Sequence, residues 1–367
     1  MNILFVLLTF IHSRGPRTIH IDPNYDGDCF ETPCAMKTAT LIVRAADTVI
    51  FPPTVIRPNN YPSEFSDLFI QLTLMNTTVI SKGTVVDGTY LAGDMLFQVT
   101  SHPVYTWTIF HNWTFRHFSK PIFTRQYTWS TGPFLIFRDC VFEDCQYDLF
   151  IMKGGTIFFE NCQFKNISGR PIKAVSELRV DFTDCIFEST QALFFHGSDA
   201  SFVNCKFSNI KGQRGGAIYT AKSTLFVNRC SFSNCLAEAN GGAIYIRESS
   251  ENFETEIQDS CFIHNHAKIN GSDIYVYLSR IELSGENCFT QSFEESVYSF
   301  SSEVSIQNNK SVIIDDKCFD CLKKKPAEVL ENDYTPTDTN KWYQFDDLKP
   351  GTTIQLDEEE DEDDDNF

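Results

Sequence analysis

Residues 137–142 read FRDCVF, and this pattern of an aromatic residue, any residue, Asn or Asp, Cys, any residue and Phe recurs along the chain. Three more copies follow: FENCQF (159–164), FTDCIF (182–187) and FVNCKF (202–207). A fifth segment, FVNRCSF (226–232), carries the pattern with one inserted residue. The cysteines of successive copies stand 20 to 25 residues apart, and a spacing of that size suits one turn of a solenoid.

The spacing inside the repeat indicates which kind of solenoid the chain forms. In a straight strand residues two apart share a face, so Cys140 and Phe142 would point one way and Phe137 the other. All three are hydrophobic, so we expect a bend between them. Asn and Asp tolerate the backbone angles of such a bend. The bend residues are Asp139, Asn161, Asp184 and Asn204. Their stacking predicts a polar ladder whose side chains are held inward by hydrogen bonds along the stack.

A second recurring signal is the string GGAIY, which occurs at residues 215–219 and again at 241–245. Paired glycines allow positive φ and a close approach of the backbone just before a β run. The glycines are Gly215, Gly216, Gly241 and Gly242. Ordinary hairpin turns would also use glycine. Glycines that recur at the same position of successive repeats favour the stacked turns of a solenoid. The 34 Phe residues likewise favour strands over helices.

FSN followed by GGAIY resembles the repeats of chlamydial polymorphic membrane proteins, whose paired signatures are GGAI and FxxN. The resemblance covers about residues 134–275. It implies an all-β fold, a single-stranded right-handed parallel β-helix of the pectate-lyase-like kind. Residues 34–53 also resemble the capping segment and first strand found in many such folds, where a short helix covers the open end of the coil.

The chain divides into four predicted regions. Residues 1–13 are apolar and end in a small residue, which predicts a signal peptide, with a buried N-terminal strand as the alternative. Residues 14–34 form an N-terminal extension, 35–322 the β-helix, and 323–367 a disordered acidic tail with nine consecutive acidic residues at 357–365. No other segment is long and apolar enough to span a membrane. The protein is therefore expected to be secreted or displayed at the cell surface.

The cysteines of the repeat are expected to form one column along the coil. Adjacent rungs lie about 4.8 Å apart, a separation that favours a buried stack of thiols over a disulfide-linked spine. The column consists of Cys140, Cys162, Cys185, Cys205 and Cys230. Cys29 with Cys34 is the better disulfide candidate, and Cys145 or Cys235 could form others in turns. The spacing of Cys318 and Cys321 fits a terminal disulfide or rung packing better than a zinc site, which would need two more ligands.

Catalytic chemistry is harder to place. Asp139 and Asp184 would lie two rungs apart, about 9.6 Å, which is near the spacing of an inverting glycosidase. Ladder residues held inward would not reach a substrate, and Asp181 shows no partner on neighbouring rungs. We therefore assign no catalytic residue, no cofactor-binding residue and no metal ligand, and predict no cofactor. The net charge of −19 excludes nucleic acid as a partner.

Five Asn residues stand in glycosylation sequons. Asn166, Asn270 and Asn309 fall in predicted turns or loops and are the expected acceptors. Asn76 and Asn112 fall in the inward ladder phase and should escape modification.

The predicted function is adhesion, ligand display or surface scaffolding without catalysis, with extracellular glycans or cell-surface proteins as partners. This prediction rests mainly on the family resemblance. One alternative is a pectate-lyase-like polysaccharide lyase or glycoside hydrolase, which an exposed charged cluster in a groove would favour. The other is a structural component of a secreted coat.

Overall fold

The computed structural model describes residues 16–22, 24, 27–44, 46–58, 77–89, 91, 97–98, 107–124, 134–176, 178–248, 255–307, 312–314 and 318. They all belong to the first of two compact units, Met1–Leu322; the second unit is Lys323–Phe367. The predicted signal peptide and the predicted acidic tail both lie outside the described residues.

Most described strands belong to three long parallel sheets. Sheet 1 contains, in spatial order, β1 (Thr18–His20), β2 (Thr48–Phe51), β4 (Thr77–Ser81), β7 (Trp107–His111), β10 (Phe134–Arg138), β13 (Gly155–Glu160), β16 (Leu178–Thr183), β19 (Asp199–Val203), β23 (Leu225–Asn228), β27 (Thr255–Gln258), β31 (Arg280–Ser284) and β34 (Glu303–Ile306). Sheet 2 contains β3 (Val55–Ile56), β5 (Val85–Asp87), β8 (Thr114–Arg116), β11 (Val141–Glu143), β14 (Gln163–Ile167), β17 (Ile186–Thr190), β20 (Lys206–Ser208), β24 (Ser231–Ser233), β28 (Cys261–Ile263), β32 (Asn287–Phe289) and β35 (Val312–Ile314).

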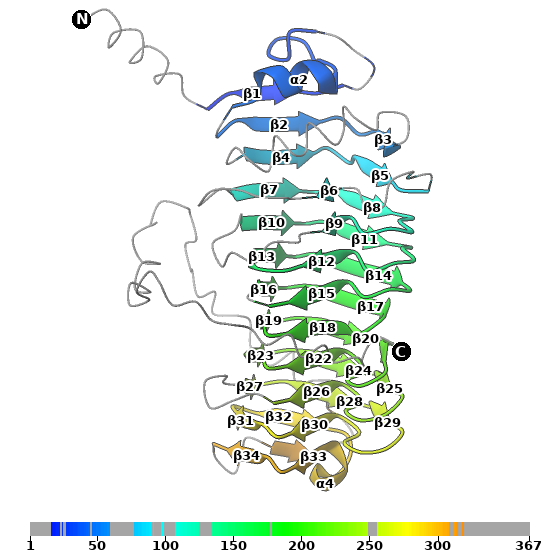
Figure 1. The fold of residues 1–367 in the computed structure, drawn as a ribbon, viewed down its shortest axis with the longest axis vertical. Helices are drawn as coiled ribbons and strands as arrows, with labels where there is room; N and C mark the ends of the chain where they lie inside the picture. Colours follow the sequence, from blue (N-terminus) through cyan, green and yellow to red (C-terminus); the bar gives the residue numbers. More distant parts are fainter. Residues whose placement is uncertain are drawn as a thin grey trace, which may run out of the picture. The chain divides into compact units, whose positions relative to one another are not determined.

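Sheet 3 contains β6 (Phe97–Gln98), β9 (Phe123–Thr124), β12 (Phe150–Met152), β15 (Ile172–Val175), β18 (Leu193–His196), β22 (Ile218–Ala221), β26 (Ile244–Arg247), β30 (Ile274–Tyr277) and β33 (Val297–Phe300). A small fourth sheet contains β21 (Lys211–Gly212), β25 (Leu236–Ala237) and β29 (His266–Ala267). The chain visits sheets 1, 2 and 3 in turn, so β10, β11 and β12 make one rung and β13 returns beside β10. Repeated rung by rung, this path makes a parallel β-helix (Figure 1).

The interior is built from columns of stacked Phe rings. In sheet 1 the rings of Phe137, Phe159, Phe182 and Phe202 follow one another at centroid distances of 5.2, 5.0 and 4.8 Å. A second column in sheet 2 has the same kind of spacing; its members are Phe142, Phe164, Phe187, Phe207 and Phe232. All these rings are buried. Burying rings of this size is the main favourable contribution to folding.

The fifth repeat segment has no inserted residue, so that prediction was wrong. Val227, and not Phe226, pairs with Phe202 and occupies the inward position of the column. Arg229 then takes the bend, with φ of 53°. Because a one-residue shift moves a side chain to the opposite face of a strand, Phe226 lies on the outer face of sheet 1.

The bends between sheets 1 and 2 lie where the repeat predicts them. Asp139, Asn161, Asp184 and Asn204 have φ between 52° and 56°, the left-handed region that Asn and Asp tolerate. Side-chain bonds link the bends: the Nδ2 of Asn161 donates to Asp139 Oδ1 at 2.5 Å, and Asn204 donates to Asp184. The side chains nevertheless point outward and are exposed. The predicted inward ladder was wrong, because the backbone amides already bond along the stack and leave the side chains at the corner.

Helix α2 (Met36–Ile42) covers the N-terminal end of the coil, as the resemblance implies (Figure 1). It buries Met36 and Ala39 against the first rungs. Strand β1, from the predicted N-terminal extension, already pairs with β2 in sheet 1. A short helix, α4 (Phe293–Ser296), precedes the last strand of sheet 3. No described helix is long and apolar enough to cross a membrane.

Candidate functional site

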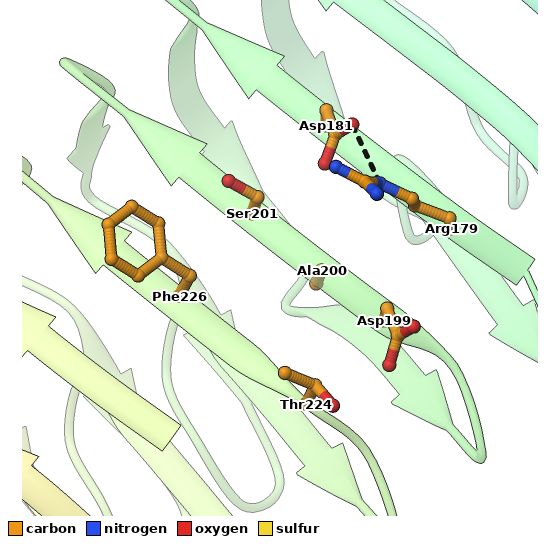
Figure 2. A pocket seen from close by; sticks show the side chains of 7 residues that line it. All are labelled: Arg179, Asp181, Asp199, Ala200, Ser201, Thr224 and Phe226. Atoms are coloured by element: carbon orange, nitrogen blue, oxygen red, sulfur yellow. Dashed lines mark hydrogen bonds and ion pairs between the residues drawn. The ribbon is translucent and has the colours of Figure 1, made fainter. Parts of the chain in front are cut away.

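The outer face of sheet 1 is hollowed over three consecutive strands, β16, β19 and β23 (Figure 2). The open hollow has a volume of about 300 Å³. Its lining residues are Arg179, Asp181, Asp199, Ala200, Ser201, Thr224 and Phe226. The parallel register brings them together, because Arg179 pairs with Asp199, and Asp181 with Ser201, which in turn pairs with Phe226. We call this set the sheet 1 hollow.

Two carboxylates and one guanidinium set the electrostatics of the sheet 1 hollow. The Nε of Arg179 lies 3.0 Å from Asp181 Oδ2, and the Asp181 side chain is only 18% exposed. Burial raises the pKa of Asp181, opposed by the Arg179 charge and assisted by the neighbouring Asp199 carboxylate. Asp181 therefore has an ion-pair partner within its own strand, whereas its neighbour on the next rung is another carboxylate. The ion pair joins residues two apart in β16, and only the pairing register of β16 with β19 reveals that Asp199 lies nearby.

The outer face of sheet 3 carries an aromatic ladder. Its rings, stacked at 4.9, 5.4, 5.2 and 5.3 Å between centroids, are Phe194, Tyr219, Tyr245, Tyr275 and Tyr298. Two of them, Tyr219 and Tyr245, are the tyrosines of the GGAIY strings, whose recurrence in the sequence signals the repeat. Alternation along each strand points the Ile of GGAIY inward and its Tyr outward.

Comparison with known proteins agrees with this architecture. Residues 109–232 match the family model described as "Right handed beta helix region". The chain folds as a right-handed parallel β-helix. No curated protein matches the chain. Among solved structures it is similar to the crystal structure of pectate lyase Pel9A, with 10% sequence identity and a TM-score of 0.34, over 71% of this chain and 78% of that one.

The cysteine column of the right-handed β-helix consists of free, buried thiols. Each thiol donates to a carbonyl one rung back; the Sγ of Cys162 lies 3.3 Å from Phe137 O, and that of Cys185 lies 3.3 Å from Phe159 O. Burial raises the pKa of Cys140, Cys185 and Cys205 well above that of a free thiol. These thiols are therefore packing groups with little thiolate character.

The predicted disulfides in turns are not formed. Cys145 and Cys235 are free and buried, and burial raises the pKa of each thiol to about 12. Their positions point into the coil, where no second cysteine is within bonding reach among the described residues.

We predict that the thiols of the β-helix resist alkylation in the native protein. Iodoacetamide requires a thiolate, and burial disfavours both the thiolate and the approach of the reagent. Peptide mass spectrometry should find Cys140, Cys185 and Cys205 unmodified after native treatment and fully modified after denaturation. Rapid native alkylation of any of the three would contradict their buried position.

Two disulfides join pairs of described cysteines at the ends of the β-helix, and Cys261 is disulfide-bonded as well. Cys29 bonds to Cys34 beside α2, and Cys288 bonds to Cys318 at the last rungs. Cys321, the other half of the CxxC pair, lies outside the described residues. Among the described residues no three His, Cys, Asp or Glu side chains are grouped to hold a metal ion.

The paired glycines serve two different needs of the turn before sheet 3. Gly215 and Gly241 have φ of 66° and 69°, which a residue with a Cβ rarely adopts. Gly216 and Gly242 allow close stacking, since a Cβ on either would lie 1.9 Å from a carbonyl oxygen of the next rung.

The sequons are distributed differently from the prediction. Asn166 is exposed within β14, where its φ is 53°, and does not lie in a turn, whereas Asn270 is half-buried in the turn before β30. Asn112 is exposed, although its Nδ2 donates to Ser81 O at 3.1 Å, so its predicted inward position was wrong for the same reason as the ladder. Asn76 and Asn309 lie outside the described residues.

Proposed function

We propose that this protein is a secreted or cell-surface scaffold that binds a neutral or amino-sugar glycan at the sheet 1 hollow without cleaving it. The observation that carries the proposal is the mixture of groups in the hollow. One outward aromatic ring, Phe226, offers a surface to the apolar face of a sugar. The carboxylates of Asp181 and Asp199 accept hydrogen bonds from hydroxyls or ammonium groups, and Ser201 and Thr224 donate or accept.

The charge of the hollow restricts the ligand. Two carboxylates against one guanidinium leave it negative, which disfavours acidic sugars and favours neutral or cationic ones. The GGAI and FxxN motifs support display at a surface, because the repeats they resemble belong to surface proteins. That support is at the level of the fold and does not identify a ligand.

Glycoside hydrolysis is the second candidate function, and one observation favours it. A hydrolase needs a protonated carboxyl beside an ionised one, and Asp181, with its raised pKa, stands near Asp199. We favour binding because Asp181 is only 18% exposed and lies 3.0 Å from the Arg179 guanidinium, so its carboxyl group is held in an ion pair and is poorly accessible to a glycosidic oxygen.

Glycan-array binding of the full chain tests the proposed site. We expect Phe226→Ala and Asp199→Asn each to weaken binding of neutral or amino-sugar glycans by about tenfold, since each removes one principal contact. The matched control is Glu188→Gln, which removes an exposed carboxylate from sheet 2 and should leave binding unchanged. Equal binding by all variants would contradict the assignment of the site.

A further inference from the structure

We propose that the outer face of sheet 3 is a second binding site, which takes a glycan chain bearing anionic groups. It is independent of the sheet 1 hollow, because it lies on another sheet and carries the opposite charge. Four basic residues define what we call the cationic strip: Arg170, Lys173, Arg214 and Arg247. They lie on or beside the central strands of sheet 3, β15 to β26, in a protein of net charge −19.

The aromatic ladder holds two guanidinium groups of the strip in place. The Cζ of Arg170 lies 4.8 Å from the centroid of the Phe194 ring, and that of Arg214 lies 5.8 Å from the Tyr245 ring. A guanidinium stacked over a ring keeps its N–H donors at its edge, free for a ligand. Tyr245 is only 5% exposed, so the ring is a fixed support for the guanidinium.

The strip extends along the coil. Lys173 pairs in register with Phe194 at the end of the ladder. Arg247 points outward from β26, two residues after Tyr245, and lies beside Ala221 of the previous rung. Counting about 4.8 Å per rung, the cations from the β15 rung to the β26 rung span about 14 Å. A linear ligand with anionic groups along its length could therefore contact several of them at once.

Nearby carboxylates leave most of the strip unneutralised. Arg247 pairs with Glu248, with 2.6 Å between Nε and Oε1. Asp148 accepts a bond from the backbone N–H of Arg170 at 2.7 Å, which leaves the Arg170 guanidinium on its ring. Among the described residues, no carboxylate forms an ion pair with the side chains of Arg170, Lys173 or Arg214. Guanidinium groups without a carboxylate partner can bind sulfate or carboxylate groups through bidentate hydrogen bonds.

The form of the surface favours a glycan over an acidic peptide. Extended peptides bind sheets by adding a strand to a free edge. Here β15, β18, β22 and β26 each pair with a strand on both sides, so no edge is free. A face of cations without a free edge suits a sugar chain, whose anionic groups can contact several guanidinium and ammonium groups along its length.

The test measures binding of heparin, polygalacturonate and poly-glutamate to the full chain. The double variant Arg170→Gln, Arg214→Gln is compared with Arg138→Gln, Arg280→Gln, which removes two positive charges from sheet 1. We expect the sheet 3 variant to bind its glycan about a hundredfold more weakly, about tenfold per guanidinium, and the control to bind like the parent. Affinity should fall as salt rises.

The three probes separate the sources of the anion. Tighter binding of heparin than of polygalacturonate would identify sulfate as the preferred anionic group of the ligand. The reverse order would identify carboxylate. Equal or tighter binding of poly-glutamate, equal loss in the control variant, or no binding of either glycan would overturn the proposal. Asp199→Asn should leave this binding intact, so its outcome does not depend on the sheet 1 hollow.

Discussion

Replacing Phe182 with Ala is expected to lower the free energy of unfolding by about 3–5 kcal/mol. The Phe182 ring is fully buried and stacks on Phe159 at 5.0 Å and on Phe202 at 4.8 Å, with the edge of Phe187 at 5.3 Å. Alanine would remove these contacts and leave a cavity that paired rungs on both sides cannot close. Urea unfolding followed by circular dichroism measures the loss.

The matched control for this prediction is Phe226→Ala. It deletes the same ring from the same sheet but from the outer face, and it should cost less than about 1.5 kcal/mol. Equal losses at the two positions would contradict the register in which Val227, and not Phe226, faces the interior.

Asp273→Asn is expected to stabilise the protein at neutral pH by about 2–3 kcal/mol, because the upward shift of the Asp273 pKa on folding destabilises the ionised form. Asp273 is 1% exposed and stands where the GGAI turns have Ala217 and Ala243. Asn265 Nδ2 donates to its Oδ1 at 2.8 Å, while Oδ2 has no hydrogen-bond partner among the described residues. Burial raises the pKa of Asp273 from 3.8 to about 6, against the hydrogen bond from Asn265.

The pH dependence of this effect follows from linkage. Because the folded pKa exceeds the unfolded one, the protonated carboxyl contributes its full stability below about pH 4, and this contribution is lost as the pH rises through about 6. Asparagine stays neutral, so parent and variant should unfold alike near pH 3.5 and diverge by pH 7.5. Asp199→Asn, at an exposed carboxylate, is the control. If the variant were no more stable than the parent at neutral pH, the ionised Asp273 carboxylate would not destabilise the folded protein, and the prediction would be wrong.

The repeat predicted the coil because its physical basis is local. Three hydrophobic residues at the spacing of Phe137, Cys140 and Phe142 require a bend, and the structure bends at Asp139. The direction of the bend side chain could not be predicted in this way. It depends on whether backbone amides or side chains carry the hydrogen bonds between rungs, and the backbone does.

The candidate sites were less accessible to sequence analysis. Arg179 and Asp199 are 20 residues apart and meet only because β16 and β19 pair in one particular register. Because the fifth repeat segment is shifted by one residue, Phe226 faces the same hollow. The repeat pattern had predicted that this ring lies in the core. The cationic strip escaped notice for a similar reason, since Arg170 and Arg214 precede their strands and reach rings of other rungs.

The most direct test of the proposed function takes an oligosaccharide that binds the protein on the glycan array and incubates it with the full chain. Both the complex and the sugar are then analysed by mass spectrometry. We predict an intact oligosaccharide that the parent binds and that the Phe226→Ala and Asp199→Asn variants bind more weakly. Shortened products bearing new reducing or unsaturated ends, lost in Asp181→Asn, would contradict it and assign the sheet 1 hollow to catalysis.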